Sequence, residues 1–421
     1  MTIARPVILA SLVAFPAAAQ EVDRSAIVET YADIAKAGYT DSLETARALD
    51  EAIQVLVDNP TEETLDAARQ AWVEARVPYQ QTEVYRFGNP IVDDWEGRVN
   101  AWPLDEGLID YVAPTYGTDS DINTLYTANV IANDSIELNG ETVDTSEITP
   151  ALLQDNLQEA GGVEANVATG YHALEFLLWG QDLNGTEAGA GTRPATDFST
   201  GDDCTNGNCD RRGQYLSSAS DLLISDLEEM VANWEADGAA RTNLTGGSTD
   251  AALSAILTGM GSLSYGELAG ERMKLGLLLH DPEEEHDCFS DNTHASHYYD
   301  AKGIQNVYLG EYEGPDGDVT EGTALTDLVA ATDPALDEEM RTRLDETVSA
   351  MQAIVDAAES GEAYDQQIGE GNEEGNARVQ AAIDALIAQT RTIERVIAAL
   401  DLGEVSIEGS DSLDAPDAVF Q

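Results

Sequence analysis

Basic side chains are scarce in this chain: its 421 residues include 20 Lys and Arg against 80 Asp and Glu, a formal charge of -60. A field of this sign repels nucleic acid and anionic lipid and attracts cations, so a nucleic-acid-binding function is excluded. Hydrophobic residues still make up 43% of the chain and recur at regular spacing, which argues against disorder. Most acidic side chains are therefore expected on a solvated surface.

Long apolar runs are also missing. No segment reaches the roughly 18 uninterrupted apolar residues that a membrane-spanning helix needs, so no transmembrane helix is expected. At the N-terminus, Arg5 precedes the short apolar stretch 7–15 and the small residues Ala17 to Ala19. This pattern predicts a signal peptide over residues 1–19 and an exported mature chain. No Cys follows the cleavage site, so a lipid anchor is not expected.

Cysteine is rare, with three residues in the chain. Cys204 and Cys209 enclose the turn-forming sequence Thr-Asn-Gly-Asn, and an exported protein keeps disulfides. We therefore expect a disulfide between these two residues. A zinc knuckle is the alternative, but no second Cys pair or nearby His completes one. Cys288 is then left as a buried thiol.

Strand patterns are sparse, and helical spacing of apolar residues dominates. A helix over 46–57 is predicted to end before Asn59-Pro60, and Asn59 with Glu62 is predicted to form a capping box for the next helix, which runs towards residue 83. The sequence Asn139-Gly140 favours one short hairpin over 135–143. Further helices are predicted at 151–158, 163–180, 211–236, 250–279, 334–358 and 379–400.

Repeated long helices with short connections indicate an all-α fold of two antiparallel helical bundles. The expected domains are an N-terminal bundle over 20–190, a C-terminal bundle over 211–403 and an acidic tail over 404–421. Two segments interrupt the helical pattern, 184–212 and 281–322, and both are predicted to be irregular. Four of the five histidines lie between residues 280 and 297.

The segment Gly170 to Phe176 places an imidazole and a carboxylate one helical turn apart, in an apolar run that continues to Trp179. Residues three apart share one face of a helix, so His172 and Glu175 are expected to point at one spot. Burying a carboxylate there costs several kcal/mol unless a charge, a metal or hydrogen bonds compensate it. The alternative is that Glu175 pairs with an Arg of a neighbouring helix and His172 is a satisfied core histidine.

Several segments together resemble the imelysin-like family (peptidase family M75), also described as insulin-cleaving metalloproteases or as iron-regulated protein A. The motif Gly170-Tyr171-His172-Ala173-Leu174-Glu175 fits the family signature Gly-x-His-x-x-Glu. The resemblance implies two helical bundles, with the signature near their junction, and a role in bacterial iron acquisition. Supporting matches are 72–88, 102–104, 264–273 and 285–294.

His172 and Glu175 supply only two ligands, so a metal would need others from elsewhere in the fold. Glu83 is the first candidate, because it lies on a matched segment otherwise built for a helix interior. Asp291 and His286 rank lower, because they lie in an irregular segment. Glu267 and Glu271 lie close to Arg272 in the sequence. For these three residues, the alternative to a metal-binding role is a buried ion pair. A set of carboxylates and imidazoles suits iron, ferrous or ferric, with zinc as the alternative.

The sequence thus predicts an exported iron-binding protein, periplasmic or associated with the outer membrane. Its ligand would be a metal ion or an iron chelate, and its expected partner an envelope iron transporter. One alternative is a haem-binding protein with His172 as axial ligand. The other is a metallopeptidase, but the His-Glu-x-x-His helix of zincins carries two histidines and this helix carries one. No catalytic residue is assigned, and little general peptidase activity is expected.

Overall fold

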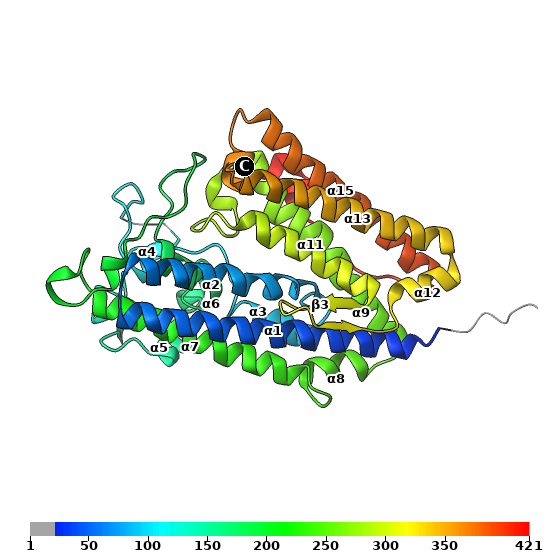
Figure 1. The fold of residues 1–421 in the computed structure, drawn as a ribbon, viewed down its shortest axis with the longest axis horizontal. Coiled ribbons are helices and arrows are strands. Elements are labelled where there is room, and N and C mark those ends of the chain that lie inside the picture. The colour runs from blue at the N-terminus through cyan, green and yellow to red at the C-terminus, as the bar shows by residue number, and fades with distance from the viewer. Residues whose placement is uncertain (1–21, 119, 121, 421) are drawn as a thin grey trace, which may run out of the picture.

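The computed structural model describes residues 22–118, 120 and 122–420. The expected signal peptide lies outside these residues. Within them the chain is helical apart from two small hairpins and the connecting loops. Two groups of long helices lie side by side and form the lower and upper halves of the molecule in Figure 1. No helix in this part of the chain is both long and apolar enough to cross a membrane.

The first bundle contains α1 (Arg24–Asp58), α2 (Glu62–Gln80), α6 (Gly170–Trp179) and α7 (Cys209–Asn233). Helix α1 packs along both α2 and α7, and α6 packs against α2 and α7 (Figure 1). The second bundle was expected to begin at residue 211. This boundary is wrong, because α7 belongs to the first bundle. The irregular stretch that precedes α7 is a long excursion within that bundle.

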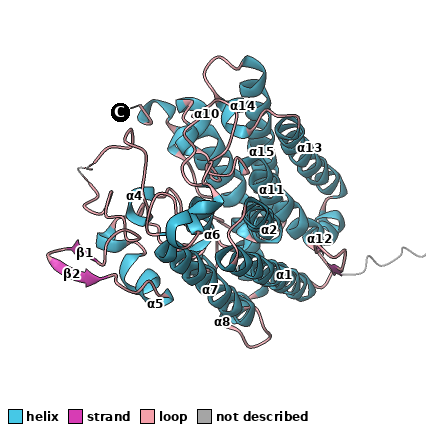
Figure 2. Cartoon of the chain, turned by 60° about the vertical axis from the view of Figure 1, so that its left-hand side comes forward, coloured by secondary structure: helices cyan, strands magenta, loops and turns pink. Residues whose placement is uncertain are grey.

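The second bundle contains α9 (Thr249–Ser262), the π-helical segment η6 (Leu263–Lys274), α11 (Thr293–Leu309), α13 (Pro334–Glu359) and α15 (Glu373–Ala399). Helix α13 packs against α11 and α15, and η6 packs against α15. Helix α11 also contacts α2, so it joins the two bundles (Figure 2). The predicted all-α architecture is confirmed.

Short elements connect the long helices. The remaining α-helices are α3 (Pro90–Glu96), α4 (Glu106–Ile109), α5 (Pro150–Leu152), α8 (Ala239–Thr245), α10 (Leu275–Leu279), α12 (Leu325–Thr332), α14 (Tyr364–Ile368) and α16 (Asp411–Asp414). The single-turn segments are η1 (Glu83–Tyr85), η2 (Leu153–Leu157), η3 (Ala160–Gly162), η4 (Ala195–Phe198), η5 (Gly201–Asp203), η7 (Pro282–Glu284) and η8 (Pro416–Ala418).

Two predicted helix ends agree with the structure, but one predicted cap is wrong. Helix α1 ends at Asp58 as predicted, and Asp333 caps α13 by accepting from the amides of Ala335 and Leu336. The predicted capping box of Asn59 and Glu62 is wrong. Thr61 is the N-cap of α2, because its extended backbone lets its hydroxyl accept from the Thr64 amide at 3.2 Å.

The predicted hairpin is present. Strands β1 (Ser135–Leu138) and β2 (Glu141–Asp144) pair antiparallel with Leu138 opposite Glu141. Asn139 and Gly140 have φ values of 54° and 82°, the conformation that a two-residue turn of this type requires. A second hairpin was not predicted: β3 (Glu311–Glu313) pairs antiparallel with β4 (Val319–Glu321).

Two expected boundaries in the middle of the chain are wrong. Residues 281–322 were expected to be irregular, but 17 of them form α11. The helix expected over 163–180 begins only at Gly170. Helix α11 was not predicted, because a regular spacing of apolar residues was the signal used for helices. Its buried positions include polar side chains, among them His297, Asp300 and Asn306.

The expected acidic tail, described over 404–420, contacts the second bundle between residues 407 and 412. Ile407 lies over Gly261, where a Cβ would come within 2.7 Å of its side chain. Ser410 lies over Gly270, where a Cβ would come within 2.3 Å, and Ser412 donates to the Gly270 carbonyl at 2.9 Å. Glycines on α9 and η6 therefore make room for the tail.

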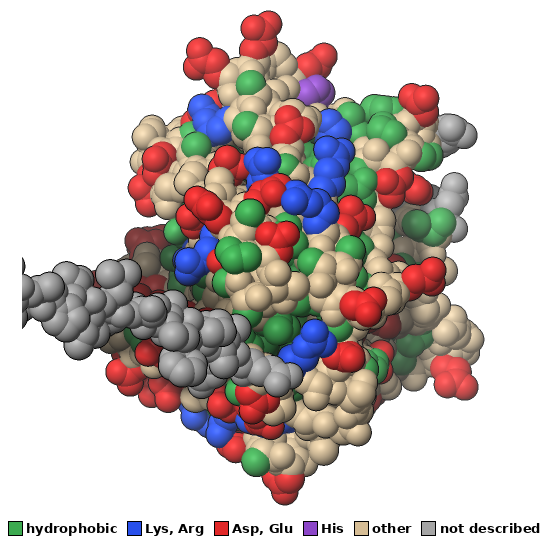
Figure 3. Space-filling model, turned by 90° about the vertical axis from the view of Figure 1, so that its right-hand side faces the viewer, with side chains coloured by type: hydrophobic (Ala, Val, Ile, Leu, Met, Phe, Trp, Pro, Cys, Tyr) green, Lys and Arg blue, Asp and Glu red, His purple; other side chains and the backbone are tan. Residues whose placement is uncertain are grey.

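Acidic side chains are spread over the face shown in Figure 3, with fewer basic side chains between them. This distribution agrees with the expected solvated acidic surface. The two bundles bury aromatic side chains such as Trp72, Trp234 and Tyr215. A cluster of buried ionisable groups on α6 and on the loop before α11 defines the candidate site.

Candidate functional site

The motif helix α6 is buried over its entire length. It begins at Gly170, which has a φ of +78°, and the Tyr171 amide donates to the Val99 carbonyl at 2.8 Å. A Cβ at position 170 would lie 2.3 Å from the Val99 carbonyl oxygen. The first glycine of the motif is thus required both by its backbone conformation and by the close approach of residue 99.

We expect Gly170→Ala to destabilise the fold strongly. Gly162 provides the matched control, because its φ is +75° and a Cβ there would meet nothing within 4 Å. Gly162→Ala should cost about 1–2 kcal/mol, the price of a left-handed backbone alone. Gly170→Ala should cost at least about 2 kcal/mol more, because Val99 must also move. Urea unfolding of both variants measures the difference, and equal losses would contradict the role given to Val99.

His172 and Glu175 face each other as the motif predicts. Nδ1 of His172 lies 3.1 Å from Oε2 of Glu175, and both side chains are buried. The other carboxyl oxygen, Oε1, accepts from the amide of Ser290 at 3.0 Å and from its hydroxyl at 2.7 Å. Ser290 therefore fixes Glu175, and Glu175 in turn fixes the orientation of the imidazole.

Burial and the neighbouring charges keep this pair uncharged. Burial, and after it the charge of Asp287, raises the pKa of the Glu175 carboxyl well above its ordinary value. Burial, and after it the charge of Arg76, lowers the pKa of His172 to about 3. The imidazole of His172 is therefore uncharged at neutral pH and does not repel a cation, while the raised pKa of Glu175 favours its protonated form.

A buried ion pair lies beside the motif. Arg76 on α2 contacts Oδ1 of Asp287 at 2.8 Å, and its guanidinium lies against the ring of Tyr171. Oδ2 of Asp287 accepts from Asn292 at 3.0 Å and also from the Ser296 hydroxyl. Burial alone would raise the pKa of Asp287, but the Arg76 charge and these hydrogen bonds outweigh it and the pKa is lowered. Asp287 is therefore an ionised carboxylate.

His286 completes the cluster. Its ring centroid lies 4.7 Å from that of His172, and its Nδ1 lies 3.9 Å from Oδ1 of Asp287. One potential ligand atom from each of His172, His286 and Asp287 lies within 4.8 Å of the others. Nε2 of His172 and Nδ1 of His286 are buried and lack a hydrogen-bond partner among the described residues. Two imidazoles and one carboxylate form a donor set typical of non-haem ferrous sites.

A cleft between the bundles leads to this cluster. It has a volume of about 500 Å³, and its walls include His286, Trp102 and Arg272. The ring of Trp102 lies 5.9 Å from that of His286 and covers it on the cleft side. Most of the other charged groups on the walls are acidic: Glu96, Glu159, Glu164, Glu267, Glu271 and Glu284.

Glu83, the first additional ligand candidate from the sequence, is not part of the cluster. Its Oε2 lies 2.6 Å from Arg272, which also contacts Asp300 at 3.0 Å and Glu267 at 2.9 Å. The buried ion pair considered for Arg272 and Glu267 is therefore present, and Glu83 belongs to it. A buried Glu in a helix interior gives the same sequence pattern whether its partner is a metal or an Arg.

Asp291 is also separated from His172. Its nearest acidic neighbours are Glu285 and Asp365, with potential ligand atoms within 4.8 Å of one another. Burial, and after it the charge of Asp365, raises the pKa of Asp291 to about 7. Asp287, in contrast, was not among the ligands proposed from the sequence. Arg76 on the apolar side of α2 was the signal that could have revealed it, since a buried guanidinium requires a carboxylate partner.

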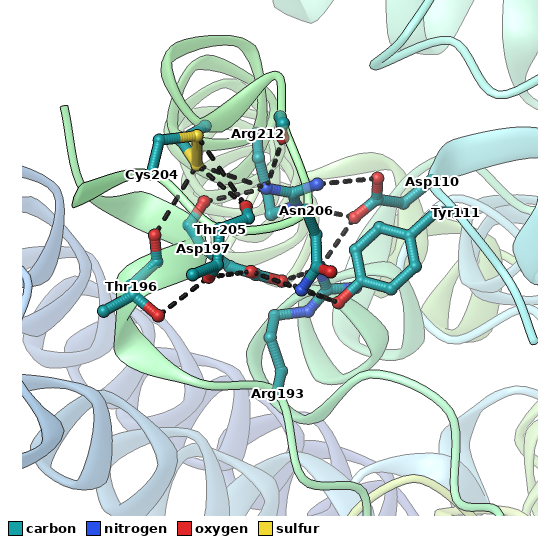
Figure 4. The surroundings of a disulfide bond; sticks show 11 residues. Asp110, Tyr111, Arg193, Thr196, Asp197, Cys204, Thr205, Asn206 and Arg212 are labelled. Carbon is teal, nitrogen blue, oxygen red and sulfur yellow. Dashed lines mark hydrogen bonds and ion pairs between the residues drawn. A yellow bond between two sulfur atoms is a disulfide. The ribbon is translucent and has the colours of Figure 1, made fainter. Parts of the chain in front are cut away.

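Cys204 and Cys209 are joined by the expected disulfide, and Cys288 is a free, buried thiol. The disulfide closes the loop at the start of α7 (Figure 4). Beside it, Arg193 and Arg212 both contact Oδ2 of Asp110, at 2.7 and 2.6 Å. The disulfide loop is thus attached to a buried ionic network, and these cysteines are not available as metal ligands.

Comparison with known proteins identifies the family of this chain. The family model described as Imelysin matches residues 35–393. A protein named iron-regulated protein A from Synechococcus elongatus is 23% identical over 363 residues, which cover 84% of this chain and 79% of the relative.

Two solved structures have a similar fold. One is a putative iron-regulated protein A precursor from Parabacteroides distasonis, with a TM-score of 0.64, 19% identity and coverage of 89% of this chain and 94% of that one. The other is an imelysin-like protein from Psychrobacter arcticum, with a TM-score of 0.56, 15% identity and coverage of 91% and 100%. Because the family model matches most of the sequence, this chain belongs to the imelysin family.

Proposed function

We propose that this protein is an exported iron-binding protein of the bacterial cell envelope that takes part in iron acquisition. In this proposal His172, His286 and Asp287 hold the iron, and Glu175 orients His172. The observation that carries it is a pair of buried imidazole nitrogens that lack a hydrogen-bond partner among the described residues, in a cluster that also contains the ionised carboxylate of Asp287. Buried polar atoms are normally hydrogen-bonded, so two unpartnered imidazole nitrogens in one buried cluster favour a ligand there.

The chemistry of the cluster favours iron. Imidazole and carboxylate donors suit ferrous iron, and zinc is the main competitor for the same set. The arrangement of Glu175 against Nδ1 of His172 is the one by which metal proteins fix the orientation of a ligating histidine. The relatives whose names contain "iron-regulated" support the same choice of metal.

The acidic cleft supports capture of a cation. Six glutamates on its walls create a negative potential, which raises the local concentration of cations. His286 lines the cleft and its ring contacts that of His172, which does not line it, so His286 is the first of the two imidazoles that an entering ion meets. In this proposal the cleft supplies the ion, and an envelope iron transporter is the partner that receives it.

The alternatives fit the geometry less well. A haem iron would have to reach His172, whose residue is 1% exposed and lies behind His286. A metallopeptidase needs an open metal position and a general base beside it. Glu175 is held by Ser290 and His172 inside the protein, so a peptide bond cannot approach it without a large opening of the site.

Metal analysis of protein purified from a periplasmic fraction, followed by calorimetric titration, tests the proposal. Ferrous iron added without oxygen is expected to bind at one site per chain, and Zn²⁺ to compete for it. Haemin should produce no strong visible absorption band of a coordinated haem, and unfolded peptides should not be cleaved. Stoichiometric haem binding, or cleavage that chelators abolish, would replace the proposal with the corresponding alternative.

Iron affinity is expected to rise with pH until the pH passes the raised pKa of Glu175. A cation on the imidazole requires Glu175 in its ionised form, and the raised pKa of Glu175 means that a proton must leave. Each unit of pH should then change the affinity by up to about tenfold below that pKa. The proton on Glu175 sets this dependence rather than protonation of His172, whose pKa is about 3.

Titrations at several pH values, in buffers of different ionisation enthalpy, measure both the affinity and the proton release. Glu175→Gln is the informative variant, because it keeps the shape of the side chain and removes its titration. Its iron affinity should be lower at high pH and almost independent of pH. An unchanged pH dependence in this variant would show that another group releases the proton.

A further inference from the structure

A second group of acidic side chains lies on the other side of the loop that carries His286. Glu285 and Asp291 come from this loop, and Asp365 comes from α14. Glu285 is 1% exposed and Asp365 is 0% exposed, while Asp291 is partly exposed. One oxygen from each of the three carboxyl groups lies within 4.8 Å of the other two.

These carboxyl groups lack the partners that buried carboxylates normally have. No hydrogen bond of good geometry from a described residue reaches either oxygen of Glu285 or Asp365, or Oδ1 of Asp291, although the Thr293 hydroxyl lies near Glu285 and the Gln366 amide lies near Asp365. No Arg or Lys of the described chain forms an ion pair with any of the three. Burying unpaired carboxylates in this way costs several kcal/mol. A structural role through ion pairing, such as that of Glu83 or Asp287, is therefore excluded for this trio.

Proton sharing does not explain the arrangement either. Carboxyl groups that share protons form short O–H···O hydrogen bonds, and no hydrogen bond joins any two of these three among the described residues. The three carboxyl groups are close enough for one cation to contact an oxygen of each. Tyr364 supports the same conclusion, because its buried hydroxyl near Glu285 also lacks a partner.

We propose that Glu285, Asp291 and Asp365 form a second cation site, separate from the histidine cluster and of the all-oxygen type that binds Ca²⁺. Ca²⁺ takes oxygen ligands at about 2.3–2.6 Å, so two oxygens on opposite sides of it are about 4.6–5.2 Å apart. Mg²⁺ has bonds of about 2.0–2.1 Å and demands a tighter octahedron. The three oxygens lie within 4.8 Å of one another, which is compatible with the larger ion, and an irregular set of three carboxyl groups suits the flexible coordination of Ca²⁺ better than a strict octahedron. The absence of nitrogen donors makes this site a poor one for zinc or ferrous iron.

The proposed ion would attach α14 to the loop before α11. Asp365 reaches the trio from near the end of the chain, whereas Glu285 and Asp291 flank the loop residues that build the histidine cluster. Ca²⁺ is therefore expected to raise the thermal stability of the protein, since it binds the folded state and not the unfolded chain. This proposal does not depend on iron binding at His172.

Calorimetric titration of Ca²⁺ into the full chain at physiological salt tests the proposal. Asp365→Asn and Glu285→Gln should each weaken Ca²⁺ binding by at least about tenfold, as the loss of even an outer-shell partner does in metal sites. Glu338→Gln is the matched control, because Glu338 is exposed on α13 and its loss also removes one charge. His172→Ala should leave Ca²⁺ binding unchanged.

Stability measurements distinguish a loss of Ca²⁺ binding from a loss of folding in the variants. Without Ca²⁺, Asp365→Asn should be at least as stable as the parent, because it removes a buried unpaired charge. With Ca²⁺, the parent should become more stable and Asp365→Asn should not. If Asp365→Asn and Glu285→Gln bind Ca²⁺ as tightly as Glu338→Gln, the trio is not a cation site. Loss of Ca²⁺ binding in His172→Ala, with retention in Asp365→Asn, would likewise overturn the proposal.

Discussion

His172→Ala is expected to weaken ferrous iron binding by more than about 100-fold while leaving the helical fold intact. The substitution removes one of two imidazoles from the cluster, and loss of a direct ligand should exceed the 10- to 100-fold effect of losing an outer-shell partner. The remaining neighbours keep their own contacts, because Glu175 retains Ser290 and Asp287 retains Arg76. Anaerobic calorimetric titration, with circular dichroism on the same samples, measures both effects.

His280→Ala is the matched control for this experiment. Nδ1 of His280 contacts the Ile368 carbonyl at 2.6 Å, and the residue lies outside the cluster. Iron affinity should therefore remain at the parent value in His280→Ala. If His172→Ala binds iron as tightly as the parent, the iron site lies elsewhere and the proposed function loses its structural basis.

The largest expected effect on stability is that of Arg272→Met. Arg272 is 3% exposed and is the shared partner of Glu83, Glu267 and Asp300. Removing one partner of a buried ion pair typically costs about 3–5 kcal/mol, because the other charge remains buried without compensation. Here one guanidinium serves three carboxylates, so we expect a loss at or above that range. Urea unfolding followed by circular dichroism provides the measurement.

Arg395→Met is the control with the same change of side chain. Arg395 pairs with Glu339 at the surface, where both side chains are substantially exposed. Such pairs contribute about 0–1 kcal/mol, so the control should unfold close to the parent. Adding Asp300→Asn to Arg272→Met should recover part of the lost stability. Equal stability of the two methionine variants would show that the buried network does not support the fold.

Local chemistry was sufficient to predict several element boundaries. Asn59-Pro60 ends α1, Asp333-Pro334 begins α13, and Asn139-Gly140 forms the hairpin turn. Each of these depends on the backbone preferences of two adjacent residues, which do not require the rest of the fold.

Other features of the fold depend on contacts between residues far apart in the sequence, and local patterns could not predict them. Helix α11 was missed because polar residues on its buried face are stabilised by distant side chains: Asp300 by Arg272 and Asn306 by Gln81. The bundle to which α7 belongs was also not predictable, since the sequence does not specify which earlier helix will pack along it.

In the candidate site, too, some contacts were predictable from the sequence and others were not. The spacing of His172 and Glu175 predicted their contact, because it depends only on the geometry of one helix. The assignments of Glu83 and Asp287 depended on partners far along the chain. Arg272 lies 189 residues from Glu83, and Asp287 lies 211 residues from Arg76. Which buried acid has a guanidinium partner therefore becomes clear only in three dimensions.

Glu285, His286 and Asp287 are consecutive in the sequence, and this arrangement bears on the thermodynamics of ligand binding. Their side chains meet three different environments: the carboxylate trio, the cleft with His172, and Arg76. Because one short piece of backbone carries all three, cations bound at the two proposed sites would both constrain it, and their binding free energies would then be coupled. Such linkage is reciprocal, so whatever factor one ligand imposes on the affinity for a second, the second imposes on the first. This tripeptide is thus the shortest covalent path by which the two clusters can act cooperatively.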